Sequence, residues 1–237
     1  MSDPHAHPRR VLLLGASGLV GQQVLQQAVG RTDLRLIAVA RSEVPLPTDA
    51  RMAVVVALVE GWAEAIATAR PAYVICALDT TIAQQGGDRE AFAAVDRDLV
   101  LHAARLAREM GAQGMAVVSS VGADRNARNF YLRVKGEMEA GLEQEGFARL
   151  DVLRPGLLRG PRTGSVRPLE LAGRVLAPVV NLTLTGQRRN YRAIRARDVA
   201  RAALQLACEK APGRFVHHYD DMLRLAGYWQ RAKEAQR

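Results

Sequence analysis

Short, wholly apolar runs alternate with segments of helical periodicity along most of this chain. Strands are predicted at residues 11–14, 34–40, 52–56, 73–78, 115–119 and 150–154. Helices are predicted between them at 22–29, 62–69, 88–110 and 131–145. Strands that are apolar on both faces belong to parallel sheets covered by helices on each side. The sequence therefore predicts an α/β fold with a doubly wound, mostly parallel, Rossmann-like sheet.

A single domain is predicted for residues 10–237, after a polar tail at 1–9 that is expected to be disordered. The 237 residues are 49% hydrophobic and 24% charged, which is an ordinary globular composition. After Pro155 the pattern becomes irregular, and residues 157–195 are expected to form a small substrate lobe. Later elements are predicted as helices at 169–180 and 198–208 and as a strand at 214–218.

The N-terminal residues and the cysteines predict a cytoplasmic protein. Residues 1–10 lack the apolar stretch of a signal peptide, and the chain has no run of 18 apolar residues that could span a membrane. Cys76 and Cys208 are the only cysteines, so neither a disulfide framework nor a Cys-based zinc site is expected. No metal and no membrane contact is predicted.

The net charge of +9 would suit a nucleic-acid-binding protein. Arginine supplies 30 of the 33 basic residues, however, and alanine is abundant, a bias typical of GC-rich bacterial genomes. We therefore predict no nucleic-acid partner. Eleven arginines lie between Arg154 and Arg201 against only two acids. They can form a solvated surface, a site for an acidic substrate or a cofactor phosphate, or a contact for an acidic partner.

A glycine-rich loop, Gly-Ala-Ser-Gly-Leu-Val-Gly at 15–21, directly follows the first predicted strand and opens a helix. Gly15 would permit the tight turn, Gly18 would let the backbone approach a pyrophosphate, and Gly21 would let the helix pack on the strand. Free N–H groups at the helix start would bind the phosphates. The cofactor-binding residues predicted in this loop are Gly15, Ser17, Gly18, Leu19, Val20 and Gly21.

The end of the second predicted strand indicates which dinucleotide is bound. NAD sites usually carry an acid there, whereas this chain has Arg41 and Ser42, and its first carboxylate is Glu43. A guanidinium can pair bidentately with a 2′-phosphate, and the Ser42 hydroxyl can donate to it. We therefore predict NADP(H) in preference to NAD(H). A solvated arginine is the alternative.

Ser119 and Ser120 end the fifth predicted strand, and Tyr131 and Lys135 follow at a spacing that puts them on one face of a helix. This set resembles the Ser, Tyr and Lys of the short-chain dehydrogenase/reductase superfamily. The resemblance implies that Tyr131 is the general acid, that Lys135 lowers the pKa of the phenol and binds the nicotinamide ribose, and that Ser120 bonds the substrate oxygen. Neighbouring strand residues face opposite ways, so only one serine is expected to serve. An amphipathic surface helix is the alternative.

Further motifs follow in the order Asp96-Arg97-Asp98, Ser119 to Asp124, Tyr131 to Glu137, and Leu153-Arg154-Pro155-Gly156. Together they resemble an atypical branch of that superfamily, typified by HIV Tat-interactive protein two, over about residues 10–225. The further cofactor-lining residues that the resemblance implies are Ala77, Leu78, Ser119, Lys135, Pro155, Gly156 and Leu157.

The chain departs from the family pattern at three places, one of which is the third predicted strand, which ends in Val56-Ala57 without the Asp that often meets the adenine. Asp79 stands where glycine is expected, and the asparagine that many members carry on the next helix is absent, with Asp96 or Asp98 near its place. Asp79, Arg159 and Arg162 are the candidate substrate contacts, and the substrate is expected to be bulky or apolar.

Two functions remain open from the sequence. The Ser/Tyr/Lys set predicts an NADP(H)-dependent oxidoreductase acting on a carbonyl/alcohol pair. The departures from the family pattern favour the alternative, an NADPH-binding redox sensor that has little turnover and acts through protein partners.

Overall fold

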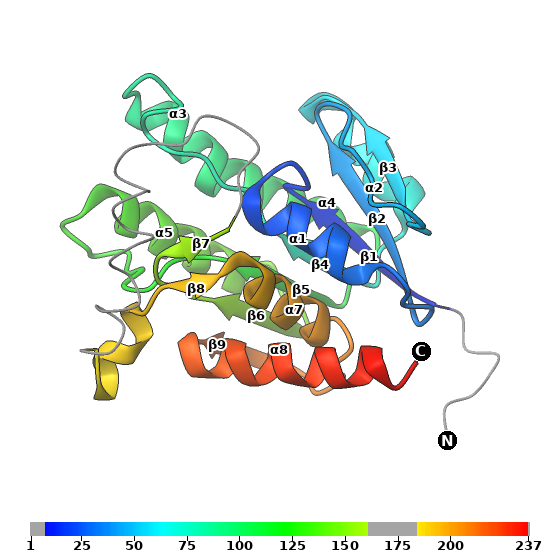
Figure 1. The fold of residues 1–237 in the computed structure, drawn as a ribbon. Helices are drawn as coiled ribbons and strands as arrows, with labels where there is room; N and C mark the ends of the chain where they lie inside the picture. The colour runs from blue at the N-terminus through cyan, green and yellow to red at the C-terminus, as the bar shows by residue number, and fades with distance from the viewer. Residues whose placement is uncertain (1–7, 161–183, 237) are drawn as a thin grey trace.

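The computed structural model describes residues 8–160 and 184–236, in which strands and helices alternate (Figure 1). The strands are β1 (Arg9–Leu14), β2 (Leu34–Ala40), β3 (Ala53–Val56), β4 (Tyr73–Cys76), β5 (Gly114–Val118), β6 (Arg149–Leu153), β7 (Leu158–Arg159), β8 (Ile194–Arg195) and β9 (Gly213–His217). The α-helices are α1 (Leu19–Ala28), α2 (Trp62–Ala69), α3 (Arg89–Ala93), α4 (Val100–Glu109), α5 (Phe130–Gln144), α7 (Ala196–Leu206) and α8 (Tyr219–Glu234). Short 3-10 helices lie at Val59–Gly61 and Gly186–Tyr191, and a π-helix at Ala94–Leu99.

Seven strands form one sheet in the order β3-β2-β1-β4-β5-β6-β9, and every pairing in it is parallel. The chain runs outward from β1 to β3 and returns to the other side of β1 through β4. The strand order therefore reverses at β1, and ligands of such sheets bind at the carboxyl ends of the strands beside that point. This architecture confirms the predicted doubly wound parallel sheet.

Two apolar layers hold the sheet between its helices. Val11 and Leu13 of β1 face the layer that includes the buried residues of α1, α7 and α8. Leu12 and Leu14 face the opposite layer, with α2, α4 and α5. All four side chains are fully buried, and each such burial stabilises the fold by about 1.5–3 kcal/mol. Burial on both faces explains why the strands are apolar without alternation.

Two predicted boundaries are wrong. Arg9, assigned to the tail, begins β1, where its N–H donates to the Asp33 carbonyl and its guanidinium donates to the Ala207 carbonyl. The single helix predicted at 88–110 is three consecutive segments, with the π-helix in the middle. That π-helix contains Asp96, a fully buried acid that the apolar periodicity of the segment does not anticipate.

The described part of the predicted substrate lobe contains the short parallel pair β7 and β8 and the 3-10 helix before β8. The helix predicted at 169–180 lies outside the described residues. The described part of the lobe therefore consists only of 157–160 and 184–195.

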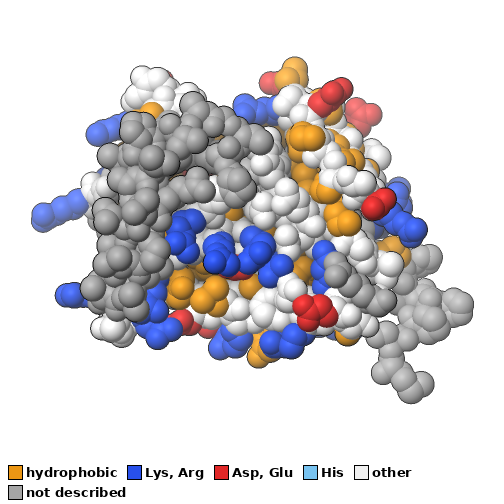
Figure 2. Space-filling model, in the orientation of Figure 1, with side chains coloured by type: hydrophobic (Ala, Val, Ile, Leu, Met, Phe, Trp, Pro, Cys, Tyr) orange, Lys and Arg blue, Asp and Glu red, His pale blue; other side chains and the backbone are white. Residues whose placement is uncertain are grey.

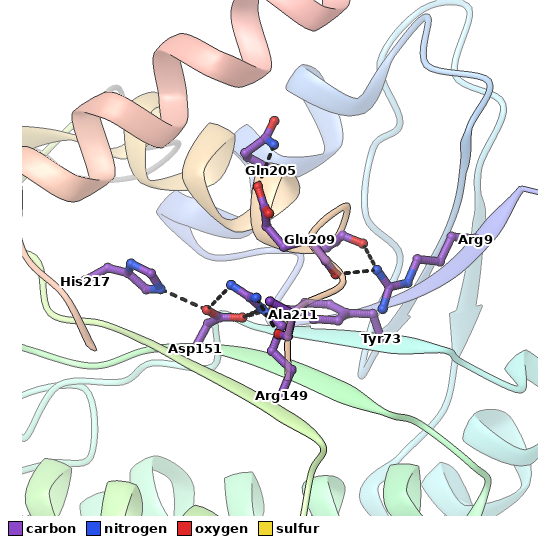
Figure 3. Close-up of polar contacts among 9 residues, drawn as sticks. Arg9, Tyr73, Arg149, Asp151, Gln205, Glu209, Ala211 and His217 are labelled. Atoms are coloured by element: carbon purple, nitrogen blue, oxygen red, sulfur yellow. Dashed lines mark hydrogen bonds and ion pairs between the residues drawn. The ribbon is translucent and has the colours of Figure 1, made fainter. Parts of the chain in front are cut away.

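A buried polar network ties β4, β6 and β9 together (Figure 3). The Asp151 carboxylate accepts hydrogen bonds from the Tyr73 hydroxyl at 2.8 Å and from Arg149 Nε and Nη2 at 2.6 and 2.9 Å. His217 Nε2 lies 2.9 Å from the same carboxylate. Removing one partner would leave a buried charge uncompensated and should destabilise the fold by about 3–5 kcal/mol, so the network has a structural role.

Candidate functional site

The glycine-rich loop between β1 and α1 lies where the strand order reverses. Gly15 has a φ of +81°, and a Cβ there would come within 2.3 Å of the Ala77 carbonyl oxygen after β4. A Cβ on Gly21 would come within 2.0 Å of the Gly15 carbonyl oxygen. Neither position can carry a side chain, because each packs directly against backbone. These contacts match the roles predicted for Gly15 and Gly21.

The start of α1 is suited to a phosphate group. Its N-cap is Gly18, which has no side chain to accept the N–H groups of the first turn, and that turn contains no acid. The unpaired N–H groups and the helix dipole favour an anion at this end. Ala77 and Leu78 approach the loop closely from the end of β4. The chain thus provides a cradle for the pyrophosphate of a dinucleotide.

Arg41 and Ser42 directly follow β2, the strand that pairs with β1, and both side chains are exposed. The neighbouring Glu43 is exposed as well. Within the described ranges, the Arg41 guanidinium has no acidic or hydrogen-bonding partner, which leaves it available to a ligand.

Helix α5 brings Tyr131 and Lys135 onto one face beside the end of β5. The helix is capped by Asn129, whose side chain accepts the N–H of Leu132 at 3.1 Å. Lys135 Nζ lies 6.0 Å from the centre of the Tyr131 ring. The Ser120 side chain lies near enough to the phenol to oppose the rise in its pKa, while its hydroxyl donates to the Val121 carbonyl at 3.3 Å. Ser120, Tyr131 and Lys135 therefore lie together, as the resemblance implied.

Ser119 is directed to a different environment from Ser120. Its hydroxyl donates to the Glu139 carboxylate, which accepts two further hydrogen bonds from Arg154, at 3.0 and 2.5 Å. Ser119 and Glu139 are both buried. The Ser119 side chain thus belongs to a structural network between β5, α5 and the end of β6, and Ser120 is the serine beside Tyr131.

Lys135 is paired with two carboxylates. Only 2% of its side chain is exposed, and its Nζ lies 2.6 Å from Asp96 Oδ1 and 3.7 Å from Asp79 Oδ1. Asp96 is completely buried and also accepts the backbone N–H of Thr80 at 3.0 Å. Asp79 is 43% exposed at the mouth of this arrangement. The lysine charge is therefore offset largely by Asp96.

Burial and these charges shift the pKa of each group. Burial raises the pKa of Asp96 to about 6, although Lys135 opposes the shift. Burial alone would lower the pKa of Lys135, but Asp96 and Asp79 outweigh it and raise that pKa. Burial also raises the pKa of Tyr131, and Asp79 and Asp96 add to this while Lys135 and Ser120 oppose it. The Lys135 charge therefore lowers the pKa of the phenol, as expected, but burial and the two carboxylates outweigh it, and the net pKa of Tyr131 is raised.

The loop after β6 approaches the site through its backbone. The Val121 N–H donates to the Pro155 carbonyl at 2.9 Å, and a Cβ on Gly156 would come within 2.5 Å of the Arg192 carbonyl oxygen. Leu157 is 58% exposed. These positions connect the loop after β5 with the chain that leads into β8.

The two arginines predicted as substrate contacts are not brought to Tyr131 by the described residues. Arg159 lines a separate cavity beside α1. Arg162 lies outside the described residues. Of the predicted substrate contacts, Asp79 alone is described next to the Tyr131–Lys135 pair.

Sequence reasoning assigned no role to the partners of the central residues. The sequence places Asp96 and Arg154 in motifs that resemble the family, but it does not predict the pairing of Asp96 with Lys135 or of Glu139 and Arg154 with Ser119. A charged residue inside the apolar pattern of 88–110 was the available signal for Asp96. Its pairing with Lys135 depends on the packing of α5 against the π-helix.

Comparisons with known proteins agree with this geometry. The model of a family described as NAD(P)H-binding matches residues 15–210. Protein fmp52, mitochondrial, of Aspergillus niger is 32% identical over 210 residues, covering 86% of this chain and 88% of the relative. Protein HTATIP2 of Rattus norvegicus is 36% identical over 172 residues, covering 70% of this chain and 69% of the relative.

Solved structures share the fold at low sequence identity. A UDP-glucose 4-epimerase of Thermotoga maritima, solved with UDP-glucose, has a TM-score of 0.65 at 16% identity over 94% of this chain and 82% of that one. The Bordetella bronchiseptica enzyme WbmH, solved with NAD⁺, has a TM-score of 0.68 at 15% identity, over 90% of this chain and 76% of that one. Among the described residues, no helix is long and apolar enough to cross a membrane.

Three findings lead to one assignment. They are the glycine loop where the strand order reverses, the cluster of Ser120, Tyr131 and Lys135, and the family match over most of the chain. The chain belongs to the NAD(P)H-binding Rossmann-fold family, as an atypical short-chain dehydrogenase/reductase related to HTATIP2 and fmp52.

Proposed function

We propose that this protein is an NADP(H)-dependent oxidoreductase that reduces a carbonyl group to an alcohol. The observation that carries the proposal is the position of the Tyr131 phenol, next to Ser120 and Lys135 at the carboxyl end of the sheet. A phenol in this place can transfer a proton to a substrate oxygen that is held beside a cofactor in the glycine-loop cradle.

The roles divide between the cofactor and this chain. The nicotinamide, when bound, supplies hydride to the carbonyl carbon. Tyr131 donates its proton to the carbonyl oxygen, and the Ser120 hydroxyl donates a hydrogen bond that holds that oxygen near the phenol. Lys135, fixed by Asp96, would orient the nicotinamide ribose, and its charge would stabilise the phenolate until solvent returns a proton to Tyr131.

The electrostatics favour the reductive direction. The raised pKa of Tyr131 keeps the phenol protonated at neutral pH, which is the form that donates a proton. Oxidation of an alcohol would instead require phenolate, which burial and the carboxylates of Asp96 and Asp79 disfavour. The proposal is therefore stated for the reductive direction, in which Tyr131 acts as the acid.

The preference for NADP(H) is supported by the exposed Arg41 and Ser42 after β2. Their guanidinium and hydroxyl groups can bind a 2′-phosphate, whereas an adenosine ribose with a free 2′-hydroxyl gains little from them. Several fungal relatives carry the word mitochondrial in their names. For this chain we keep a cytoplasmic location as a proposal.

The NADPH-binding sensor is the second candidate, and Asp79 is the observation that favours it. Its exposed carboxylate lies 3.7 Å from Lys135 at the mouth of the site, where it would repel an anionic or strongly electron-rich substrate. A protein with this site can bind cofactor through the glycine loop and still turn over slowly.

The test is a screen of NADPH oxidation by the full chain against aldehydes, ketones and quinones, with identification of the product. An alcohol formed in proportion to the NADPH consumed would support the reductase. Tight NADPH binding without consumption above the background rate for any compound would support the sensor.

A further inference from the structure

A second polar cavity lies beside α1, away from Tyr131 and Lys135. Its volume is about 680 Å³, a size common for small-molecule sites. The lining residues are Gln23, Gln26, Gln27, Arg159, Gly160, Arg195 and Arg197. None of them belongs to the glycine loop or to the Ser/Tyr/Lys set. We call it the arginine cavity.

The arginine cavity is close to the cofactor cradle but separate from it. A Cβ on Gly160 would come within 2.8 Å of Leu19 Cδ1, so the end of β7 packs against the first residue of α1. The cavity is lined from α1 by glutamines of the second and third helical turns, beyond the N–H groups that face a pyrophosphate. A ligand could therefore occupy it while the cofactor is bound.

Three guanidinium groups converge on the arginine cavity from neighbouring elements. Arg159 of β7 and Arg195 of β8 are paired in register on adjacent parallel strands, and Arg197 lies in the first turn of α7. Among the lining residues that the structure describes, none is acidic. The helix dipole of α7 adds positive potential at the same end.

These guanidinium groups are incompletely paired within the described part of the chain. The Nε atoms of Arg159 and Arg197 are buried without a hydrogen-bond acceptor, and Arg195 is exposed. Arg197 has one acidic neighbour, Asp198, whose Oδ1 lies 3.6 Å from its Nε. Buried donors without acceptors are costly in the absence of a ligand, and an anion would satisfy them.

A fourth arginine reinforces the positive charge. Arg201 donates through Nε to Gln27 Oε1 at 2.8 Å, and burial together with the nearby Arg197 lowers its pKa. Like charges therefore lie close together, and Asp198 and Glu234 compensate them only in part. Figure 2 shows Lys and Arg side chains gathered in a hollow on this face, in the region of β8 and α7.

We propose that the arginine cavity binds a small molecule that carries a diphosphate group. Three arginines can each form bidentate hydrogen bonds with phosphate oxygens, and the glutamine amides can add donors. The three positive charges around the arginine cavity match the negative charge of two linked phosphates better than that of a single phosphate. A compact hollow also suits a small polyanion, whereas duplex DNA would require a basic stripe along the surface.

The test is calorimetric titration of inorganic pyrophosphate into the full chain saturated with NADPH. Arg195→Gln is the main variant, because this exposed side chain can be changed without disturbing the core, and Arg197→Gln is the second. Arg35→Gln removes an exposed arginine on β2 and serves as the matched control. Thermal melts establish that each variant is folded.

Pyrophosphate should bind the NADPH-saturated protein, and orthophosphate should bind more weakly. Each cavity variant should weaken pyrophosphate binding by about tenfold or more, the value of one charge-assisted contact, while Arg35→Gln leaves it unchanged. Affinity for NADPH should be unaffected by every variant. The proposal is overturned if NADPH abolishes pyrophosphate binding, since the anion would then occupy the cofactor cradle, or if the cavity variants bind as the wild type does.

Discussion

Replacing Asp96 with asparagine should lower the pKa of the Tyr131 phenol. The buried Asp96 carboxylate lies 2.6 Å from Lys135 Nζ and offsets the lysine charge that would otherwise stabilise a phenolate. Asparagine has nearly the same size, and its carbonyl oxygen can still accept the N–H of Thr80, now 3.0 Å from the carboxylate. Asp96→Asn therefore removes mainly one negative charge from the site.

The distances set the size of the effect. Lys135 Nζ is 6.0 Å from the centre of the Tyr131 ring, so the Asp96 carboxylate beyond it lies within about 9 Å of that ring. With an effective dielectric constant of about 20, a unit charge at this distance contributes about 2 kcal/mol, or a little over one pKa unit. Removing a negative charge favours ionisation, so the phenol pKa should fall by about that amount.

The assay is NMR of protein labelled with ¹³C at the tyrosine ring, titrated from neutral to alkaline pH. Tyr131→Phe assigns the resonance, and thermal melts mark the pH range in which the fold persists. Asp98→Asn is the matched control, because Asp98 lies in the same π-helix but is 55% exposed and pairs with Arg97.

Asp96→Asn should titrate at lower pH than the wild type, and Asp98→Asn should match the wild type. A Tyr131 pKa that stays constant or rises in Asp96→Asn would refute the claim that Asp96 offsets the charge of Lys135.

Three other predictions test separate parts of the account. NADPH should bind at least tenfold tighter than NADH, a difference of about 1.4 kcal/mol, and Arg41→Asp should erase that preference. Calorimetry that finds equal affinities of the wild type for NADPH and NADH would contradict this prediction. Ser120→Ala should slow turnover with little change in melting temperature. Ser119→Ala should instead lower the free energy of unfolding by about 1 kcal/mol, because the Glu139 carboxylate loses a buried donor. The reverse pattern would show that the roles assigned to the two serines must be exchanged. Duplex DNA should not be retained at physiological salt, and tight binding that weakens steeply with added salt would show that the basic surface is a nucleic-acid site.

The sheet was predictable because its strands are buried on both faces. Such strands are continuous apolar runs, and the second strand, 34–40, was predicted with the bounds that the structure has. The helix α2 at Trp62–Ala69 also has its predicted bounds. The late helix α8 was missed, although Met222, Leu225 and Trp229 give it a buried face at helical spacing.

The candidate site was only partly predictable. Tyr131 and Lys135 lie one helical turn apart, so their proximity follows from local geometry. The pairing of Lys135 with Asp96 depends instead on contact between two elements far apart in the sequence, and spacing carries no information about it. For the same reason, the raised pKa of Tyr131 could not be anticipated, because it results from burial and from carboxylates on other segments.

The central claim is that Tyr131 donates the proton in an NADPH-dependent reduction. The most direct measurement compares the wild type with Tyr131→Phe, both for NADPH affinity by titration and for steady-state turnover of a carbonyl substrate found in the screen. Phenylalanine keeps the ring and removes only the hydroxyl, so NADPH affinity should be unchanged while turnover falls by about 10²–10⁴-fold, the usual contribution of general acid catalysis. Equal turnover by the two proteins on every substrate would contradict the claim and leave NADPH binding as the function of this site.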